Sequence, residues 1–81
     1  MAEPHVTEAL EQLVWFVGNS SEMLRQHGRS TASQLAYGGG ALEMLERVGL
    51  ITRAELEHWF ARVHEAAGGD DENPLAYIGN R

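Results

Sequence analysis

Three consecutive glycines, Gly38 to Gly40, interrupt a stretch of sequence that otherwise has the residue spacing of an α-helix. Positions of one helical face recur at intervals of three and four residues through it: Leu35, Gly38, Leu42 and Leu45. A solvated linker has no physical reason to keep this phase, although each glycine destabilises a helix interior by roughly 0.5–1 kcal/mol relative to alanine. We therefore predict one helix over residues 31–48, in which Gly38 faces the core and lets a neighbouring helix approach closely. A break at the glycines is the alternative.

The residues before the glycines predict a first helix that begins at about Val6. Its apolar positions share one face: Val6, Leu10, Leu13, Val14, Val17 and Leu24. The segment Gly18–Glu22 could start a new helix, so a kinked or split helix is one interpretation. The heptad from Val17 to Leu24 favours a continuous helix, and Gly28 can end it in a left-handed conformation.

The start of a third helix has the clearest local signal in the chain. Thr52 and Glu55 form a capping-box pair, and Ile51 and Leu56 occupy the positions of a hydrophobic staple. The apolar face that follows contains Leu56, Trp59, Phe60, Val63 and Ala67. Weaker capping signals predict that Thr31 and Gln34 start the second helix and that Gly49 ends it.

These helices predict an all-α fold, either a small three-helix bundle or a helical hairpin plus a helix, with a short irregular C-terminal tail. We expect a flexible N-terminus over residues 1–5, a three-helix domain over residues 6–68, and an acidic linker with an apolar tail over residues 69–81. The tail either packs on its own domain or docks on a partner. A chain of 81 residues buries only about 60% of its unfolded surface, so self-association is a plausible source of stability.

The charge of the chain argues against nucleic acid and anionic membranes as partners. The formal net charge is −6, whereas binding to phosphates or anionic lipids is driven by clustered basic residues. All six basic residues are arginine, which is typical of a GC-rich genome. A helix-turn-helix is disfavoured because the third helix would present Glu55, Glu57 and Glu65 to phosphates, with only two arginines opposing them: Arg53 and Arg62. No long apolar run or leader-like start is present, so we expect a soluble cytoplasmic protein.

The sequence offers no recognisable catalytic or cofactor chemistry. There is no cysteine, and His58 and His64 lie on different sides of the third helix, so we expect no metal site. The serines sit where helix caps or turns use hydroxyl groups: Ser20, Ser21, Ser30 and Ser33. The glycine triplet lacks the lysine and the preceding strand of a phosphate-binding loop. We therefore expect neither an enzyme nor a bound cofactor.

The segment from Leu42 to Leu56 resembles the short C-terminal oligomerisation hairpins called SHOCT. The shared features are a leucine-rich helix, the "GLIT" turn and a following helix that begins with glutamate. The resemblance covers about a quarter of the chain, and it departs from the family pattern where His58, Trp59 and Phe60 replace basic residues. It agrees with tight packing of the second helix on the third.

Several large apolar residues exceed what the core of three helices needs. Helices of a small bundle require one apolar stripe each, and the first two helices are wider than that. Phe16 and Tyr37 either widen the core or form a second buried surface, for which aromatic residues and methionine are typical. The candidate protein interface comprises Trp15, Phe16, Met23, Tyr37, Met44, Leu75, Tyr77 and Ile78.

Two functions are consistent with these patterns. The first is a small acidic helical protein–protein interaction module that self-associates, as a homodimer or higher oligomer, binds another protein, or does both, and has no catalytic activity. The alternative is an acidic inhibitor, such as one encoded by a phage, that binds a basic site on a host enzyme or nucleic-acid-binding protein. The inhibitor requires a contiguous acidic face, for which Glu8, Glu11, Glu22 and residues 70–72 are the candidates.

Overall fold

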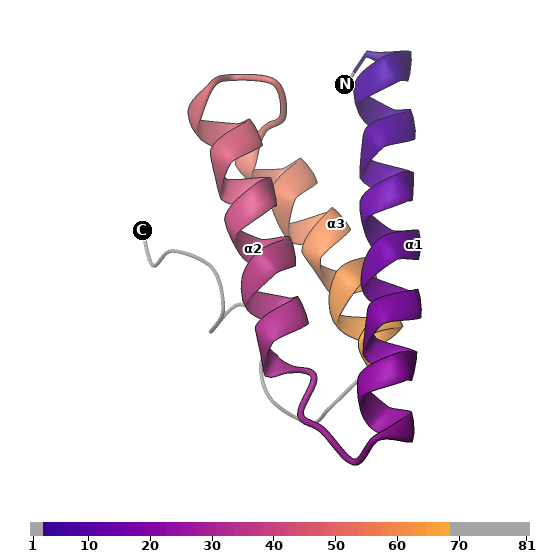
Figure 1. Cartoon of the computed structure of the whole chain (residues 1–81). Coiled ribbons are helices and arrows are strands. Elements are labelled where there is room, and N and C mark those ends of the chain that lie inside the picture. The colour runs from indigo at the N-terminus through magenta and orange to yellow at the C-terminus, as the bar shows by residue number, and fades with distance from the viewer. Residues whose placement is uncertain (1–2, 69–81) are drawn as a thin grey trace.

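The computed structural model describes residues 3–68, and these form an up-down-up bundle of three helices (Figure 1). The helices are α1 (Pro4–Gln26), α2 (Ala32–Arg47) and α3 (Arg53–Ala66), and each packs against the other two. The predicted all-α bundle is therefore confirmed. The predicted tail with Leu75, Tyr77 and Ile78 lies outside the described residues. The first helix begins two residues earlier than expected, because Pro4 occupies a first-turn position where its missing N–H is not needed.

Helix α1 is continuous through Gly18–Glu22, so the interpretation of a kinked or split helix is wrong. Gly18 has room for a side chain, since a Cβ there would lie 3.7 Å from the Cβ of Ala66 in α3, an ordinary contact distance. Ser21 is fully buried in the middle of the helix. The prediction that this serine serves a cap or turn is therefore wrong, because the continuous helix leaves no terminus there.

Both long helices end in the same backbone motif around a left-handed glycine. Gly28 follows α1 with φ 68°, and Gly49 follows α2 with φ 83°. In each case the glycine N–H and the next N–H bond back into the last turn, as in a Schellman motif: Gly28 to Arg25, Arg29 to Leu24, Gly49 to Glu46, and Leu50 to Leu45. The predicted glycine caps are confirmed at both sites.

The start of α2 differs from the prediction. Thr31 makes no side-chain cap hydrogen bond and is buried, so its capping box with Gln34 is absent. The backbone of Thr31 has φ −96° and ψ 7°, which is not the extended conformation that a side-chain cap requires. Instead, the hydroxyl of Ser30 accepts a hydrogen bond of 3.1 Å from the N–H of Ala32.

The start of α3 has the predicted capping box. The Thr52 Oγ1 accepts a hydrogen bond of 3.1 Å from the N–H of Glu55, and the Glu55 carboxylate accepts one of 2.8 Å from the N–H of Thr52. Ile51 and Leu56, the residues of the predicted staple, are both buried in the core. The helix therefore begins where local sequence specifies it.

The glycine triplet is helical, and Gly38 lies against α3. A Cβ on Gly38 would lie 2.7 Å from Cγ1 of Val63, which is closer than real Cβ contacts. Gly39 is also buried, whereas Gly40 is exposed, and a Cβ on Gly40 would have no described atom within 4 Å. Gly38 therefore allows the close helix approach that the sequence predicted, and Gly40 has no such role among the described residues.

The core fills the space between the three helices. Its buried apolar residues come from every helix and from the last connection: Val6, Leu10, Val17, Leu35, Leu42, Ile51, Leu56, Trp59, Phe60, Val63 and Ala67. Leu13, Val14 and Leu45 are partly buried against it. Every residue of the predicted face of α3 is in this core.

A bidentate ion pair between Arg53 and Glu46 links α2 and α3 across their connection. The Arg53 guanidinium donates hydrogen bonds of 3.0 Å to both carboxylate oxygens of Glu46, from Nε to Oε2 and from Nη2 to Oε1. The side chains are only 29% and 15% exposed, so the pair is better shielded than a surface salt bridge. It ties the end of one helix to the first residue of the next.

Candidate protein-binding surface

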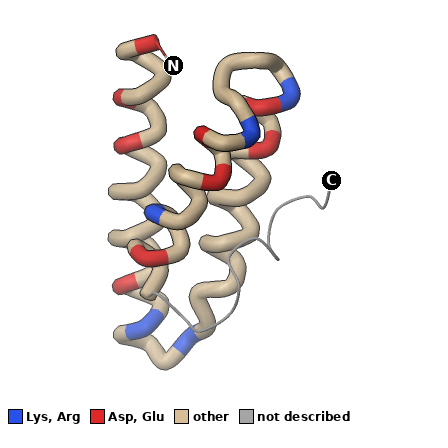
Figure 2. The backbone as a smooth tube through the Cα atoms, turned by 180° about the vertical axis from the view of Figure 1, so that it is seen from behind, with Lys and Arg blue, Asp and Glu red and all other residues tan. Residues whose placement is uncertain are grey.

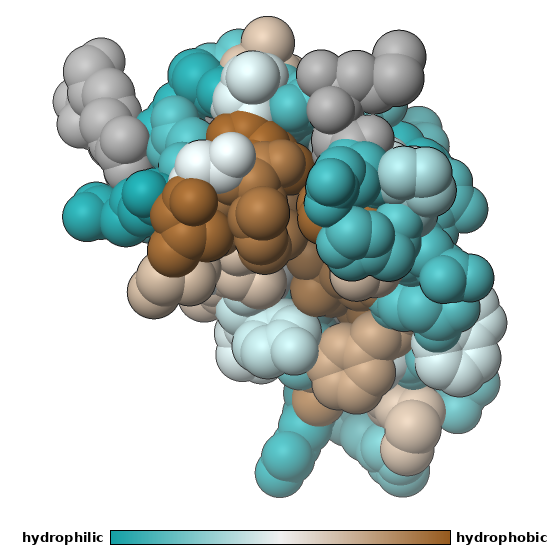
Figure 3. All heavy atoms as spheres, turned by 90° about the horizontal axis from the view of Figure 1, so that it is seen from above, coloured by the Kyte–Doolittle hydropathy of each residue, from teal (hydrophilic) through white to brown (hydrophobic). Residues whose placement is uncertain are grey.

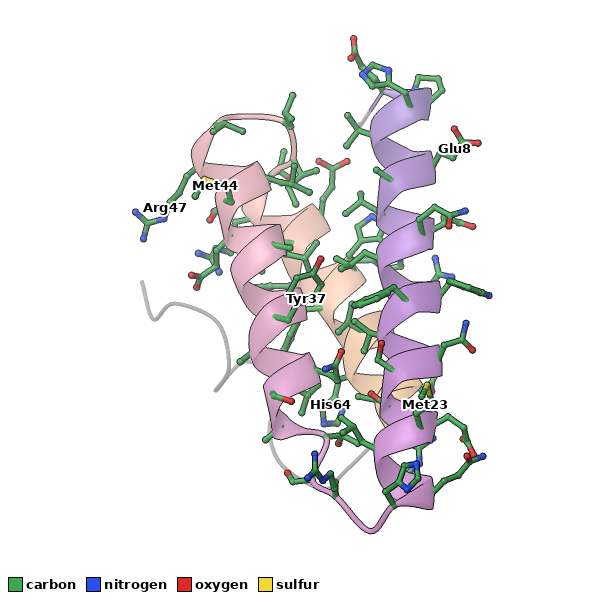
Figure 4. The ribbon with its side chains drawn as sticks, viewed as in Figure 1. Glu8, Met23, Tyr37, Met44, Arg47 and His64 are labelled. Carbon is green, nitrogen blue, oxygen red and sulfur yellow. The ribbon has the colours of Figure 1, made fainter. Side chains whose placement is uncertain are left out.

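Helices α1 and α2 share a face that α3 does not cover, since α3 packs behind them (Figures 1 and 4). We call this the α1–α2 face. A groove of about 490 Å³ runs along it in the half nearer the α2–α3 connection. Its lining is almost entirely apolar: Ala9, Leu10, Gln12, Leu13, Phe16, Tyr37, Ala41, Met44 and Leu45.

Phe16 and Tyr37 meet across this groove. Their ring centroids are 5.6 Å apart and the rings are inclined at 56°, within the usual range for an aromatic pair. Each ring nevertheless remains about half exposed, 47% for Phe16 and 55% for Tyr37. The two rings therefore line the groove at the surface and do not enter the core. Both keep apolar surface in contact with water.

The other half of the α1–α2 face has a second depression of about 570 Å³. Met23 lies here on α1, and the lining is more polar than in the first groove: Ser20, Met23, Leu24, His27, Arg29, Ser33 and Gln34. Of the eight residues predicted for an interface, the structure thus brings four to one face: Phe16, Met23, Tyr37 and Met44.

Trp15 lines neither depression. It is 65% exposed and lies on the outer side of α1, beside the α1–α2 face. The remaining three predicted interface residues fall outside the described part of the chain. Sequence reasoning missed the small and polar members of the groove, Ala9, Gln12 and Ala41. Their helical spacing was the available signal, since Gln12 and Ala41 lie four residues from Phe16 and Tyr37, and Ala9 lies seven residues from Phe16.

A further apolar area covers the end of the bundle that carries the α2–α3 connection. Viewed from that end, hydrophobic side chains gather over the connection and the neighbouring helix ends (Figure 3). Val48 and Leu50 are its exposed members, and Ile51 lies buried beneath. Val48 continues the apolar spacing of Tyr37 and Met44, whereas Leu50 has no periodic signal because it belongs to the turn.

The charges are interspersed over the bundle (Figure 2). Of the predicted acidic face of α1, Glu11 lies 3.6 Å from Arg62, and Glu22 lies 2.9 Å from Arg25. Glu8 has no ion pair within residues 3–68. The acidic residues of α1 are thus partly neutralised by arginines, as far as the described residues show.

The two outer edges of the α1–α2 face carry opposite charges. Figure 4 shows Glu8 at the outer edge of α1 and Arg47 at the outer edge of α2, both in the half nearer the α2–α3 connection. Both side chains are exposed, and neither has an ion-pair partner within the described part of the chain. An acidic edge and a basic edge therefore flank one apolar groove.

Several buried polar atoms have no hydrogen-bond partner within residues 3–68. They are the Ser21 Oγ, the Gln34 Oε1, the Glu43 Oε2 and the His64 Nε2.

Residues 3–68 bring no three histidine, aspartate or glutamate side chains together as metal ligands. In the same range, no helix has the length and apolar character needed to cross a membrane.

Comparisons with known proteins found no match, whether with protein families, with curated proteins or with solved structures. The partial resemblance of Leu42–Leu56 to the SHOCT hairpins is therefore not accompanied by a family assignment.

Proposed function

We propose that this protein is a small helical interaction module that self-associates through its α1–α2 face and has no catalytic activity of its own. One observation carries the proposal: Phe16 and Tyr37 pack on each other and still leave half of each ring exposed, over an apolar groove. Aromatic residues and methionine are the types enriched in the buried centres of interfaces.

The apolar area that remains exposed on this face supports an association. An aromatic side chain has about 200 Å² of surface, so the half-exposed Phe16 and Tyr37 leave roughly 200 Å² per copy in water. Met44 and the groove floor add to this. A typical specific interface buries about 800 Å² per partner, so these two rings alone would supply about a quarter of one.

The alternative, an acidic inhibitor of a basic site, has less support. It requires a contiguous acidic face, and two of the three candidate residues on α1, Glu11 and Glu22, lie in ion-pair range of arginines. The third, Glu8, lies beside an apolar groove. Residues 70–72, which would extend the acidic face, lie outside the described residues.

Sedimentation velocity over about 10 µM to 1 mM tests the proposal, a range that covers dissociation free energies of roughly 4–7 kcal/mol. We expect the wild-type protein to approach twice the 8.9 kDa mass of one chain, or more. Tyr37→Glu should abolish the association, because it places a charge in the centre of the apolar face.

Leu50→Glu is the matched control for that substitution. Leu50 is also a large exposed apolar residue, but it lies in the α2–α3 connection and lines neither depression. Its substitution should leave the mass unchanged. A wild-type protein that stays at 8.9 kDa throughout would contradict the proposal, as would a Leu50→Glu variant that loses association while Tyr37→Glu retains it.

A further inference from the structure

Nothing within residues 3–68 explains the glycine at position 40. It lies in the middle of α2, where glycine destabilises a helix by roughly 0.5–1 kcal/mol relative to alanine. Its neighbour Gly38 is explained by Val63, but a side chain on Gly40 would meet nothing within 4 Å among the described residues. An exposed helical glycine of this kind is suited to close approach by something outside the monomer.

Gly40 and Arg47 lie on the same side of α2, and Glu8 and Trp15 lie on the same side of α1. Each pair is separated by seven residues, which is two helical turns, so both pairs have the same separation along their helix. Figure 4 places Arg47 and Glu8 at opposite outer edges of the α1–α2 face. The acidic edge thus carries a large exposed indole, and the basic edge carries a position with no side chain.

The α1 edge of one copy is complementary to the α2 edge of a second copy when the two α1–α2 faces pack on each other. A two-fold axis parallel to the groove would place α1 of one copy over α2 of the other, running in opposite directions. Glu8 would then lie beside Arg47 of the second copy. Two turns further along, Trp15 would lie beside Gly40 of the second copy. The symmetry repeats both contacts at the other edge.

We propose that the occupant of the α1–α2 face is a second copy in this arrangement, with Glu8 paired to Arg47 and Trp15 seated over Gly40 of the other copy. This deepens the proposed function and rests on it. The central apolar contact then consists of Phe16, Tyr37 and Met44 from both copies. A two-fold axis across the groove would instead place α1 on α1, which leaves Arg47 far from Glu8.

The ionic part of the arrangement is tested by charge exchange at low salt. Glu8→Arg and Arg47→Glu each create two like-charge contacts in the homodimer and should weaken it roughly tenfold, with less effect at high salt. An equimolar mixture of the two variants restores both opposite-charge contacts, so a heterodimer of near wild-type affinity should form. The double variant should likewise recover self-association.

The contact between Trp15 and Gly40 is tested by adding a side chain at the glycine. Gly40→Leu should not lower the stability of the folded monomer, because leucine favours helix more than glycine does. It should nevertheless raise the dissociation constant of the dimer about tenfold or more, because it fills the space of the indole. Ala61→Leu, on the exposed side of α3, is the control and should leave the dissociation constant unchanged.

The outcomes separate the arrangement from the proposed function. Failure of the mixed charge variants to associate better than either alone would overturn the arrangement, as would a Gly40→Leu variant with wild-type affinity. If Tyr37→Glu still abolishes association in that case, the α1–α2 face remains the interface and only the pairing is wrong. A wild-type chain that does not associate at all would overturn both.

Discussion

Replacing Gly38 with alanine would place a methyl group against the side chain of Val63. A Cβ at this position would lie 2.7 Å from Cγ1 of Val63 and 3.7 Å from its Cβ and Cγ2. Val63 is fully buried, and a valine in a helix has one strongly preferred χ1 rotamer, so its methyl group cannot simply rotate away. The substitution therefore forces α2 and α3 apart or strains the side chain.

Two opposing effects determine the size of the change. Alanine stabilises a helix interior by roughly 0.5–1 kcal/mol relative to glycine, and overpacking of a core destabilises by about 1–3 kcal/mol. Gly40→Ala gains the same helix stabilisation without the contact, because nothing described lies within 4 Å. The difference between the two alanine variants therefore isolates overpacking, and we expect Gly38→Ala to be less stable than Gly40→Ala by about 1–3 kcal/mol.

Urea unfolding at protein concentrations low enough for the monomer to prevail measures this difference. A Val63→Ala background removes Cγ1 of Val63, which is the atom that a Cβ at position 38 would contact. In that background Gly38→Ala should become neutral or stabilising. Equal free energies of unfolding for Gly38→Ala and Gly40→Ala in the wild-type background would refute the reasoning. A Gly38→Ala effect that persists unchanged with Val63→Ala would do so as well.

Three further substitutions test how the helices are joined and capped. Thr52→Ala removes the hydroxyl that accepts the N–H of Glu55 and should lower the free energy of unfolding by ~1 kcal/mol, whereas an unchanged urea midpoint would mean that the cap contributes nothing. Gly49→Ala forces a side chain into a backbone with φ 83° and should destabilise by about 1–2 kcal/mol in the same assay; a neutral result would contradict the left-handed conformation. Arg53→Met removes both hydrogen bonds to Glu46 and should destabilise by roughly 1–2 kcal/mol, and a stability equal to wild type would show that the pair is energetically neutral.

The helices and most of their ends could be predicted because the determining signals are local. The apolar period around Gly38 places that glycine in the core even though its neighbours lack side chains. Thr52 with Glu55, and Gly49 after the last turn of α2, encode their backbone geometry within a few residues. Such signals act over one helical turn, so they are readable without knowing the tertiary structure.

Other features depend on residues far apart in the sequence. Thr31 has the sequence of a cap, but its side chain is buried and its backbone is not extended, and the Ser30 hydroxyl instead accepts the N–H of Ala32. The sequence pattern of Ser21 suits a turn, yet α1 continues through it, and both Val17 and Ser21 are fully buried. The pairing of Glu46 with Arg53 follows from the fold of the turn and has no periodic signal.

The interaction surface was predictable in part. Excess apolar residues on two helices indicated a second surface, and the structure brings Phe16, Tyr37 and Met44 to one groove. The helical register already placed Trp15 away from the stripe of Phe16 and Met23, and the structure shows that it does not line the groove. The opposite charges at the two edges, Glu8 and Arg47, become meaningful only once the helices are placed side by side.

The most direct test of the central claim is an isotope-filtered nuclear Overhauser measurement on a mixture of labelled and unlabelled chains. It detects only contacts between copies. The account predicts cross-peaks from the Met44 methyl group of one copy to Ala9 and Gln12 on α1 of the other, and from Trp15 to Gly40. An absence of intermolecular cross-peaks at concentrations where the protein is dimeric by mass, or cross-peaks only to the exposed side of α3, would contradict it.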